Sequence, residues 1–200
     1  MKKEWRKTPL GRTKKNDNPI RWGVIGLGYM AETFSCAIDG NKDGEVYAVA
    51  SRSLDKAKTF AKNHGGCKAY GSYEEMVNDE SLKLDVIYIA TPVMYHYEHV
   101  KLCLEAGKNV LCEKPITSTL EQFEELTKIA KEHNCFFMEG MWMKCLPSFQ
   151  KACQWIKDGK IGEVELVKVD FYKREHIREG HAIYNAQEGG GILRDFGVYA

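Results

Sequence analysis

The sequence lacks the long apolar runs and the charge excess that mark several classes of protein. No uninterrupted apolar run approaches the roughly 18–20 residues that a membrane-spanning helix needs, and no apolar segment follows the first basic residues as in a secretory signal. The 29 basic and 28 acidic residues leave a net charge of +1, which offers no general attraction for a polyanion. We therefore expect a globular protein with no nucleic-acid partner and no membrane partner.

Paired cysteines are also missing. The seven cysteines form no Cys-x-x-Cys pair and are odd in number, and most lie within apolar stretches. Free thiols of this kind are typical of a reducing compartment, so we expect a cytoplasmic protein. The only local charge excess lies in residues 1–15, which hold seven basic residues against Glu4 alone. We expect residues 1–19 to form a flexible basic tail; a contact arm for nucleic acid or membrane is the alternative, and nothing downstream supports it.

Strand-like and helix-like segments alternate from residue 21 to about residue 140. The apolar runs predict strands at 21–25, 45–50, 68–70, 85–90, 109–112 and 135–138, with a helix in each connection and with Ser53, Ser72 and Ser118 as helix caps. This alternation predicts a parallel sheet covered by helices on both faces. After residue 140 the pattern changes, and we expect a helix over 147–157, a half-exposed strand over 163–172 and a helix opened by the glycines at 189–191.

A glycine-rich turn follows the first predicted strand. Residues 26–31 match the pattern G-x-G-x-x-A, a predicted helix follows them, and a second strand ends at the spacing of a dinucleotide-binding unit. The first glycine permits a tight turn and the second lets a diphosphate approach the backbone, where the helix N-terminus favours its negative charge. The sequence therefore predicts a doubly wound Rossmann domain over residues 20–140 that binds NAD(H) or NADP(H). The expected contacts in this turn are Gly26, Leu27, Gly28, Tyr29 and Met30.

The end of the second predicted strand favours one of the two cofactors. An acidic residue at this point would bind the ribose hydroxyls of NAD, but the sequence has Ser51, Arg52 and Ser53, with Lys56 nearby. A hydroxyl and a guanidinium can bind a 2′-phosphate, and no carboxylate is present to repel it. We therefore expect a preference for NADP(H), with NAD(H) possible. The alternative is that Arg52 stacks on the adenine, which would suit either cofactor.

A lysine follows the fifth predicted strand, at the carboxyl edge where ligands bind in open α/β sheets. Hydride transfer at a secondary alcohol needs a group that hydrogen-bonds the oxygen and manages its proton, and a partly desolvated lysine can do this. Lys114 is therefore a candidate catalytic residue, with Pro115 holding the backbone next to it. The alternative is a surface lysine that pairs with Glu113.

Several separated segments together resemble the Gfo/Idh/MocA family of NAD(P)-dependent oxidoreductases. The segments are GVIGLGYMA at 23–31, ASR at 50–52, ATP at 90–92 with His96, AGKNVLCEKP at 106–115, EGMW at 139–142, IGEV at 161–164 and GGGILRDFGVY at 189–199. The EGMW segment and the GVY ending resemble the branch of dihydrodiol and xylose dehydrogenases. The resemblance implies a second α/β domain with an open sheet, which begins at residue 141 and is incomplete at residue 200.

The resemblance also implies site residues. Lys114 takes the position of the family's catalytic lysine, and Asp195 and Tyr199 take those of two further active-site groups. Their spacing of four places both on one face of a helix, with Tyr199 as proton donor or acceptor and Asp195 orienting substrate hydroxyls. Lys144 stands where relatives often have arginine. The positions that border the cofactor's ribose and nicotinamide are Ala90, Thr91, Pro92, His96, the carbonyl of Glu113 and Lys114 itself.

These features predict an NADP(H)-dependent dehydrogenase that acts on a secondary alcohol of a sugar, polyol or dihydrodiol. The alternative is a non-catalytic nucleotide-binding fragment of such an enzyme, because one strand of the second sheet cannot bury itself. We expect the chain to be a truncated reading of a longer, homo-oligomeric protein; supply of the missing sheet by another chain is the alternative. His96 and His99 could bind a metal in principle, but no third ligand is evident, so no metal site is expected.

Overall fold

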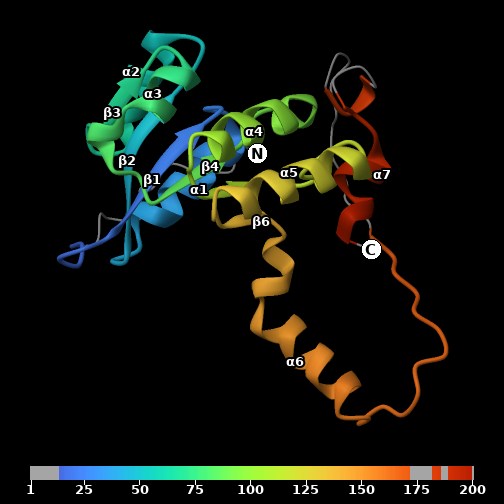
Figure 1. Cartoon of the computed structure of the whole chain (residues 1–200). Helices are drawn as coiled ribbons and strands as arrows, with labels where there is room; N and C mark the ends of the chain where they lie inside the picture. Colours follow the sequence, from blue (N-terminus) through green and yellow to red (C-terminus); the bar gives the residue numbers. More distant parts are fainter. Residues whose placement is uncertain (1–13, 172–181, 186–188, 200) are drawn as a thin grey trace, which may run out of the picture.

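The computed structural model describes residues 14–171, 182–185 and 189–199 and contains a six-stranded, fully parallel sheet (Figure 1). The strands lie in the order β3-β2-β1-β4-β5-β6, so the winding reverses between the first three and the last three. This is the doubly wound order of a dinucleotide-binding domain, and it confirms the predicted fold class. The strands are β1 Ile20–Ile25, β2 Gly44–Ala50, β3 Lys68–Tyr70, β4 Val86–Ile89, β5 Val110–Cys112 and β6 Phe137–Glu139.

Helices cover both faces of the sheet, because the strand side chains alternate between two apolar cores. In β4, Ile87 and Ile89 belong to the core under α3, α4 and α5, whereas Tyr88 belongs to the core under α1 and α2. Nearly all of these core side chains are fully buried. The helices are α1 Tyr29–Asp39, α2 Leu54–Asn63, α3 Tyr73–Asn78, α4 His96–Glu105 and α5 Leu120–Glu132.

Three of the helices begin at a side-chain cap. The hydroxyls of Ser53 and Ser72 accept hydrogen bonds from the third residues of α2 and α3, as the sequence predicts. The cap predicted for α5 is wrong by one residue: Thr119, not Ser118, accepts from the amide of Gln122 at 3.3 Å. The Gln122 side chain accepts in turn from the amide of Ser118 at 3.1 Å, so the third helical residue bonds back across this turn to the residue before the cap.

The start of the described chain is held against the end of α1. The Lys15 ammonium donates to the carbonyls of Ile38, Asp39 and Asn41, at 2.9, 3.1 and 2.7 Å. A cation at this position satisfies carbonyls that the helix end leaves unpaired. The expected flexible tail is therefore anchored at this residue, and its residues 1–13 lie outside the described part of the chain.

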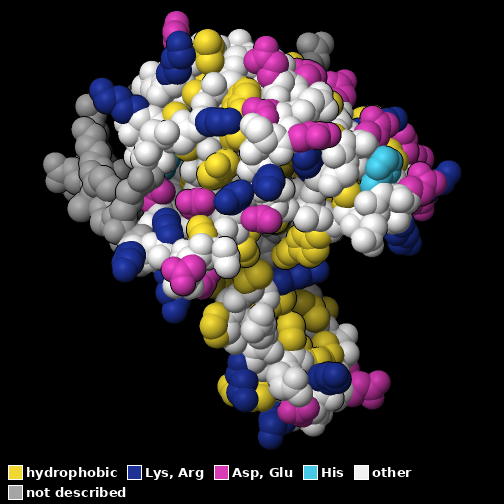
Figure 2. Space-filling view, turned by 60° about the vertical axis from the view of Figure 1, so that its left-hand side comes forward, with side chains coloured by type: hydrophobic (Ala, Val, Ile, Leu, Met, Phe, Trp, Pro, Cys, Tyr) yellow, Lys and Arg dark blue, Asp and Glu magenta, His cyan; other side chains and the backbone are white. Residues whose placement is uncertain are grey.

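Helix α6, Pro147–Lys157, follows β6 and a short 3₁₀ turn and projects away from the sheet (Figure 1). It has the predicted bounds, but none of its residues is buried. Figure 2 shows hydrophobic side chains on this projecting lobe. The exposed large apolar residues of α6 and the segment after it are Trp155, Ile156, Ile161, Val164, Leu166, Val167, Val169 and Phe171.

Two predictions for the last part of the chain are wrong. Residues 163–171 form no strand, because a strand needs a hydrogen-bonded partner and the described residues offer none beside them. A helix does begin after the glycines, with Gly191 at the N-cap of α7, Ile192–Asp195, but Tyr199 lies in a separate 3₁₀ turn, Gly197–Tyr199, so Asp195 and Tyr199 do not share one helix. Gly197 explains the division, because glycine is a poor helix former. Most of residues 172–188, before these elements, lie outside the described part of the chain. Among the described helices, none combines the length and the apolar character of a membrane span.

Candidate active site

The glycine turn connects β1 to α1 and presses against the loop after β4. Gly26 has φ +84°, and a Cβ atom there would lie 2.6 Å from the amide nitrogen of Thr91. A Cβ atom at Gly28 would meet nothing within 4 Å, and no side chain caps α1. The first N–H groups of α1 therefore border open space, and this cradle fits the diphosphate of a dinucleotide.

The other three predicted residues of this turn differ in exposure. The Leu27 side chain is buried in the core under α1 and α2, so only its backbone can face a cofactor. Tyr29 and Met30 are exposed on the first turn of α1.

The carboxyl end of β2 supplies the predicted 2′-phosphate side of the cradle. Ser51 is buried, and its hydroxyl oxygen accepts from the amide of Ser53 at 3.3 Å, which leaves its O–H free to donate to a ligand. Arg52 and Lys56 are exposed at the start of α2. Burial raises the pKa of Tyr73, and the Arg52 guanidinium opposes this rise, which places Arg52 close to that ring. The strand end is therefore basic, as predicted.

The loop after β4 is tied down by two histidines of α4. Thr91 is buried and its hydroxyl lies 3.0 Å from Nδ1 of His99. His96, fully buried, has Nε2 at 2.8 Å from the Thr91 carbonyl oxygen and Nδ1 at 2.8 Å from the Pro115 carbonyl oxygen. Burial lowers the pKa of His96. His96 thus joins the Ala90-Thr91-Pro92 loop to the turn after β5. It thereby holds in place the loop against which the glycine turn packs.

Two carboxylates hold the backbone on either side of Lys114. The phenol of Tyr88 donates to Glu113 at 2.6 Å, and the other oxygen of Glu113 accepts from the amide of Lys114 at 3.3 Å. The Lys114–Pro115 peptide is cis, and Glu139 accepts from the amide of Ile116 at 2.9 Å. Burial, followed by the Glu113 carboxylate, raises the pKa of Tyr88, so this phenol stays protonated and donates.

Sequence reasoning missed Tyr88 and Glu139. Tyr88 is the one polar-tipped side chain in the apolar strand β4, and Glu139 is the last residue of β6. The carboxyl ends of parallel strands meet at one edge of the sheet, where ligands bind. A polar group in β4 and another at the end of β6 could therefore have indicated that Tyr88 and Glu139 lie near the site.

Lys114, Asp195 and Tyr199 are brought together although they lie far apart in the sequence. The Lys114 ammonium donates to the carboxylate Oδ1 of Asp195 at 2.7 Å and to its carbonyl oxygen at 2.6 Å. It lies 5.0 Å from the centroid of the Tyr199 ring, a cation–π distance. The Tyr199 hydroxyl oxygen accepts from the indole N–H of Trp142 at 2.9 Å. The Lys114 side chain is only 13% exposed.

Two cavities are lined by neighbours of this group, though not by Lys114, Asp195 or Tyr199 themselves. One of about 520 Å³ lies beside Glu113 and is lined mainly by apolar side chains, among them Met30, Phe34, Leu111 and Trp142. Lys144 lines the other cavity, of about 510 Å³, together with Ile116 and Met141. Lys144 thus lines this second cavity, whereas the side chains in contact with the Lys114 ammonium are those of Asp195 and Tyr199.

Comparison with known proteins gives two family matches. The family described as "Oxidoreductase family, NAD-binding Rossmann fold" matches residues 20–141, and the "GFO/IDH/MocA C-terminal domain" matches residues 149–200. Trans-1,2-dihydrobenzene-1,2-diol dehydrogenase of Xenopus tropicalis is 36% identical over 181 residues, which are 90% of this chain and 54% of the relative. D-xylose 1-dehydrogenase (NADP(+)) of Hypocrea jecorina is 37% identical over 204 residues, covering 92% of this chain and 52% of the relative.

Solved structures agree with these matches. A 3-ketoreductase from Actinomadura kijaniata, in complex with NADP and TDP-benzene, has a TM-score of 0.76 and 32% sequence identity over 91% of this chain and 55% of its own. An NAD-binding protein from Listeria innocua has a TM-score of 0.77 and 30% identity over 91% of this chain and 52% of its own. The chain spans about half the length of the curated relatives that it matches.

Proposed function

The chain belongs to the GFO/IDH/MocA family of oxidoreductases, and we propose that it forms the cofactor-binding part of an NADP(H)-dependent dehydrogenase. Residues 20–140 are proposed as the cofactor-binding domain and residues 141–200 as the beginning of a substrate and dimerisation domain. The observation that carries the proposal is the contact of Lys114 with Asp195 and Tyr199, next to a glycine turn with an open cradle. The free thiols of the chain suit a cytoplasmic enzyme.

The reaction is a hydride transfer between the nicotinamide and a carbinol carbon, and the nicotinamide supplies or accepts the hydride when it is bound. The protein manages the proton on the alcohol oxygen. The Lys114 ammonium has three N–H donors and uses two of them on Asp195, so one remains for a substrate oxygen. The Tyr199 hydroxyl accepts from Trp142 and keeps its own O–H to donate. Both groups can therefore hydrogen-bond the reacting oxygen in the proposed site.

We propose that the substrate is a small molecule with a secondary alcohol, namely a sugar, polyol or dihydrodiol. The named activities of the relatives support this class, since they include a dihydrodiol dehydrogenase and a xylose dehydrogenase. Asp195 has a second carboxylate oxygen beyond the one bound by Lys114, and that oxygen can accept from a further substrate hydroxyl. A neighbouring pair of hydroxyls would engage both Lys114 and Asp195.

Substitution of Arg52 tests the proposed preference for NADP(H) over NAD(H). Replacing Arg52 by alanine is expected to weaken NADPH binding about 10- to 100-fold, because a charge-assisted hydrogen bond contributes about 1.5–3 kcal/mol. NADH binding should stay within about twofold, because NADH has no 2′-phosphate for the guanidinium to bind. The measurement is direct titration of both reduced cofactors by fluorescence, with Lys58→Ala, in the helix that follows Arg52, as the matched control.

An equal loss of both affinities in the Arg52 variant would contradict the phosphate role and indicate stacking on the adenine. Tighter binding of NADH than NADPH by the unaltered chain would overturn the NADP(H) preference itself.

A second function is favoured by the exposed lobe. The apolar residues of α6 and residues 163–171 lack a covering layer in the described structure, which suits a nucleotide-binding module that does not close over a substrate. The two functions are separated by measuring NADP⁺ reduction with a panel of sugars, polyols and dihydrodiols. Cofactor binding without turnover of any of them would favour the non-catalytic module.

A further inference from the structure

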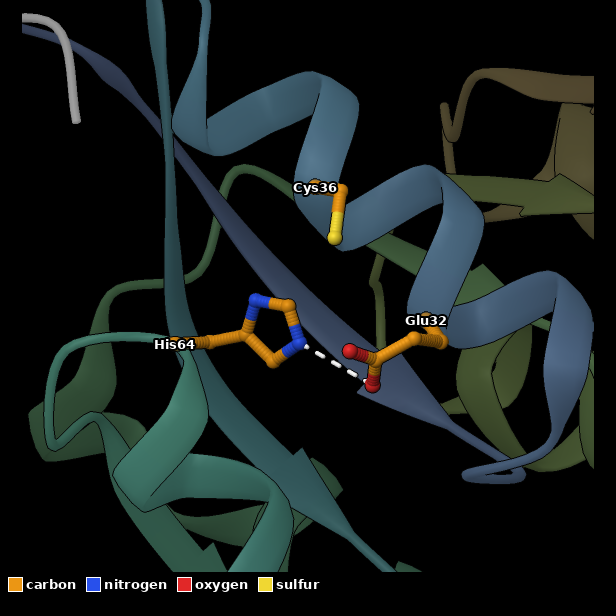
Figure 3. A group of neighbouring side chains, drawn as sticks. All are labelled: Glu32, Cys36 and His64. Atoms are coloured by element: carbon orange, nitrogen blue, oxygen red, sulfur yellow. Dashed lines mark hydrogen bonds and ion pairs between the residues drawn. The ribbon is translucent and has the colours of Figure 1, made fainter. Parts of the chain in front are cut away.

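A second group of chemically reactive side chains lies between α1 and α2, away from Lys114. Glu32 and Cys36 are one turn apart on α1, and His64 is the residue that ends α2. Figure 3 shows the three side chains pointing toward one another from the two helices. One carboxylate oxygen, the sulfur and one ring nitrogen all lie within 4.8 Å of one another. The cofactor cradle uses none of these side chains.

The His64 ring is held in one orientation. Its side chain is only 2% exposed, and its ring packs 4.5 Å from the ring of Phe60, centroid to centroid. Nδ1 lies 2.7 Å from a carboxylate oxygen of Asp39, which is itself buried. This leaves Nε2 directed at Glu32, 3.2 Å from its carboxylate oxygen. In metal sites, a histidine ligand is oriented by a hydrogen bond between a carboxylate and the ring nitrogen that does not bind the metal.

The charges around the sulfur also favour a cation. The carboxylates of Glu32 and Asp39 both bond the His64 ring, and the Cys36 sulfur lies within 4.8 Å of the Glu32 oxygen and the His64 nitrogen. A divalent cation between these groups would neutralise the crowded carboxylates and displace the thiol proton. Imidazole, thiolate and carboxylate together are donors that Zn²⁺ accepts, at metal–ligand distances of about 2.0–2.3 Å.

We propose that Glu32, Cys36 and His64 bind a Zn²⁺ ion, with Asp39 orienting the histidine and a water molecule as fourth ligand. Tetrahedral ligands at these distances lie roughly 3.5 Å apart, so the side chains need to move inward by only about 1 Å. The ion would tie α1 to α2, and the glycine cradle and Arg52 lie just before the first residues of these two helices. The competing arrangement has no metal: the His64 ring bridges Asp39 and Glu32, and Cys36 has no role in it.

Cys36 therefore decides between the two arrangements. The full chain is first altered at its two exposed cysteines, Cys145→Ser and Cys153→Ser, to remove adventitious thiolate ligands. Titration of this parent with Zn²⁺ is expected to show one equivalent bound with proton release, and a rise in melting temperature. Titration with Co²⁺ as a spectroscopic probe should show one site with a thiolate-to-metal charge-transfer band.

Cys36→Ser in the same parent should remove the charge-transfer band, weaken Zn²⁺ binding at least about 10-fold and abolish the rise in melting temperature. Cys67→Ser, a partly buried cysteine close to His64 in the sequence, is the matched control and should leave all three readouts unchanged. Glu32→Gln removes the carboxylate ligand while His64 itself is kept. This substitution should weaken Zn²⁺ binding as well.

The proposal is overturned if the parent and Cys36→Ser bind Zn²⁺ equally, or if excess Zn²⁺ leaves the parent's melting temperature unchanged. Either result would support the metal-free His64 bridge. None of these measurements uses cofactor or turnover, so the outcome is independent of the proposed dehydrogenase function.

Discussion

Replacing Lys114 by alanine is expected to lower kcat for NADP⁺-dependent alcohol oxidation by about 10²- to 10⁴-fold, the usual contribution of a positioned acid–base group. The substitution removes the one N–H donor that Asp195 leaves free for a substrate oxygen. The NADPH affinity should stay within about threefold, because the cradle at Gly26 and Gly28 does not depend on Lys114. The measurement is initial-rate kinetics on the most active substrate of the panel, with cofactor titration alongside.

Two further variants sharpen this result. Lys128→Ala removes an exposed lysine of α5 that pairs with Glu132 one turn later, and it is the control for loss of one positive charge. Tyr199→Phe keeps the ring beneath the Lys114 ammonium but removes the hydroxyl that Trp142 contacts, so it should lower kcat with little change in NADPH affinity. Turnover that survives Lys114→Ala would refute the proposed mechanism, even if the protein is an oxidoreductase.

Two glycines of the turn should respond to substitution in opposite ways. Gly26→Ala is expected to destabilise the fold by about 2 kcal/mol or more, for two reasons. Alanine would be strained in the left-handed backbone conformation of Gly26, and its Cβ atom would clash with the Thr91 backbone. Gly28→Val should leave the stability nearly unchanged, since Gly28 has an extended backbone and its Cβ direction is open. The valine would instead fill the cradle and weaken NADPH binding by at least about 10-fold.

Chemical denaturation and NADPH titration of both variants measure these two effects separately. Gly66→Ala is the matched control for Gly26→Ala, because Gly66 has φ +74° and open space around its Cβ direction. Its cost is the backbone strain alone, so Gly26→Ala should cost clearly more. If Gly28→Val binds NADPH as tightly as the unaltered chain, the diphosphate does not lie at the start of α1.

The sequence determined the cofactor-binding domain because the signals for it are local. Buried parallel strands read as short apolar runs, and helices begin at serine or threonine caps, so the predicted bounds agree with β1 to β6 within about two residues. The glycine turn is local as well, and its two glycines carry the two properties expected of them, a strained turn and an open approach. The cap of α5 shows the limit of such signals, because Ser118 and Thr119 are equally good caps in sequence.

The resemblance to the Gfo/Idh/MocA family, which rests on scattered segments, is confirmed by the family matches over residues 20–141 and 149–200. The resemblance also implied that Lys114, Asp195 and Tyr199 are site residues, and this remains a prediction. The expected strand over 163–172 failed for a physical reason: an alternating pattern states which face of a strand is apolar, but the strand forms only beside a partner.

Only the tertiary structure decided what lies next to what. Tyr88 and Glu139 are residues of different strands, and they support the turn at Lys114 because parallel strands end at one edge of the sheet. The sequence predicted that His96 borders the cofactor's ribose. In the structure both of its ring nitrogens lie 2.8 Å from backbone carbonyl oxygens, one in each of two loops. Cys36 and His64 lie on different helices, so their proximity has no signature in the sequence. Local pattern thus determined the elements and the cradle, whereas packing of distant segments decided the two candidate sites.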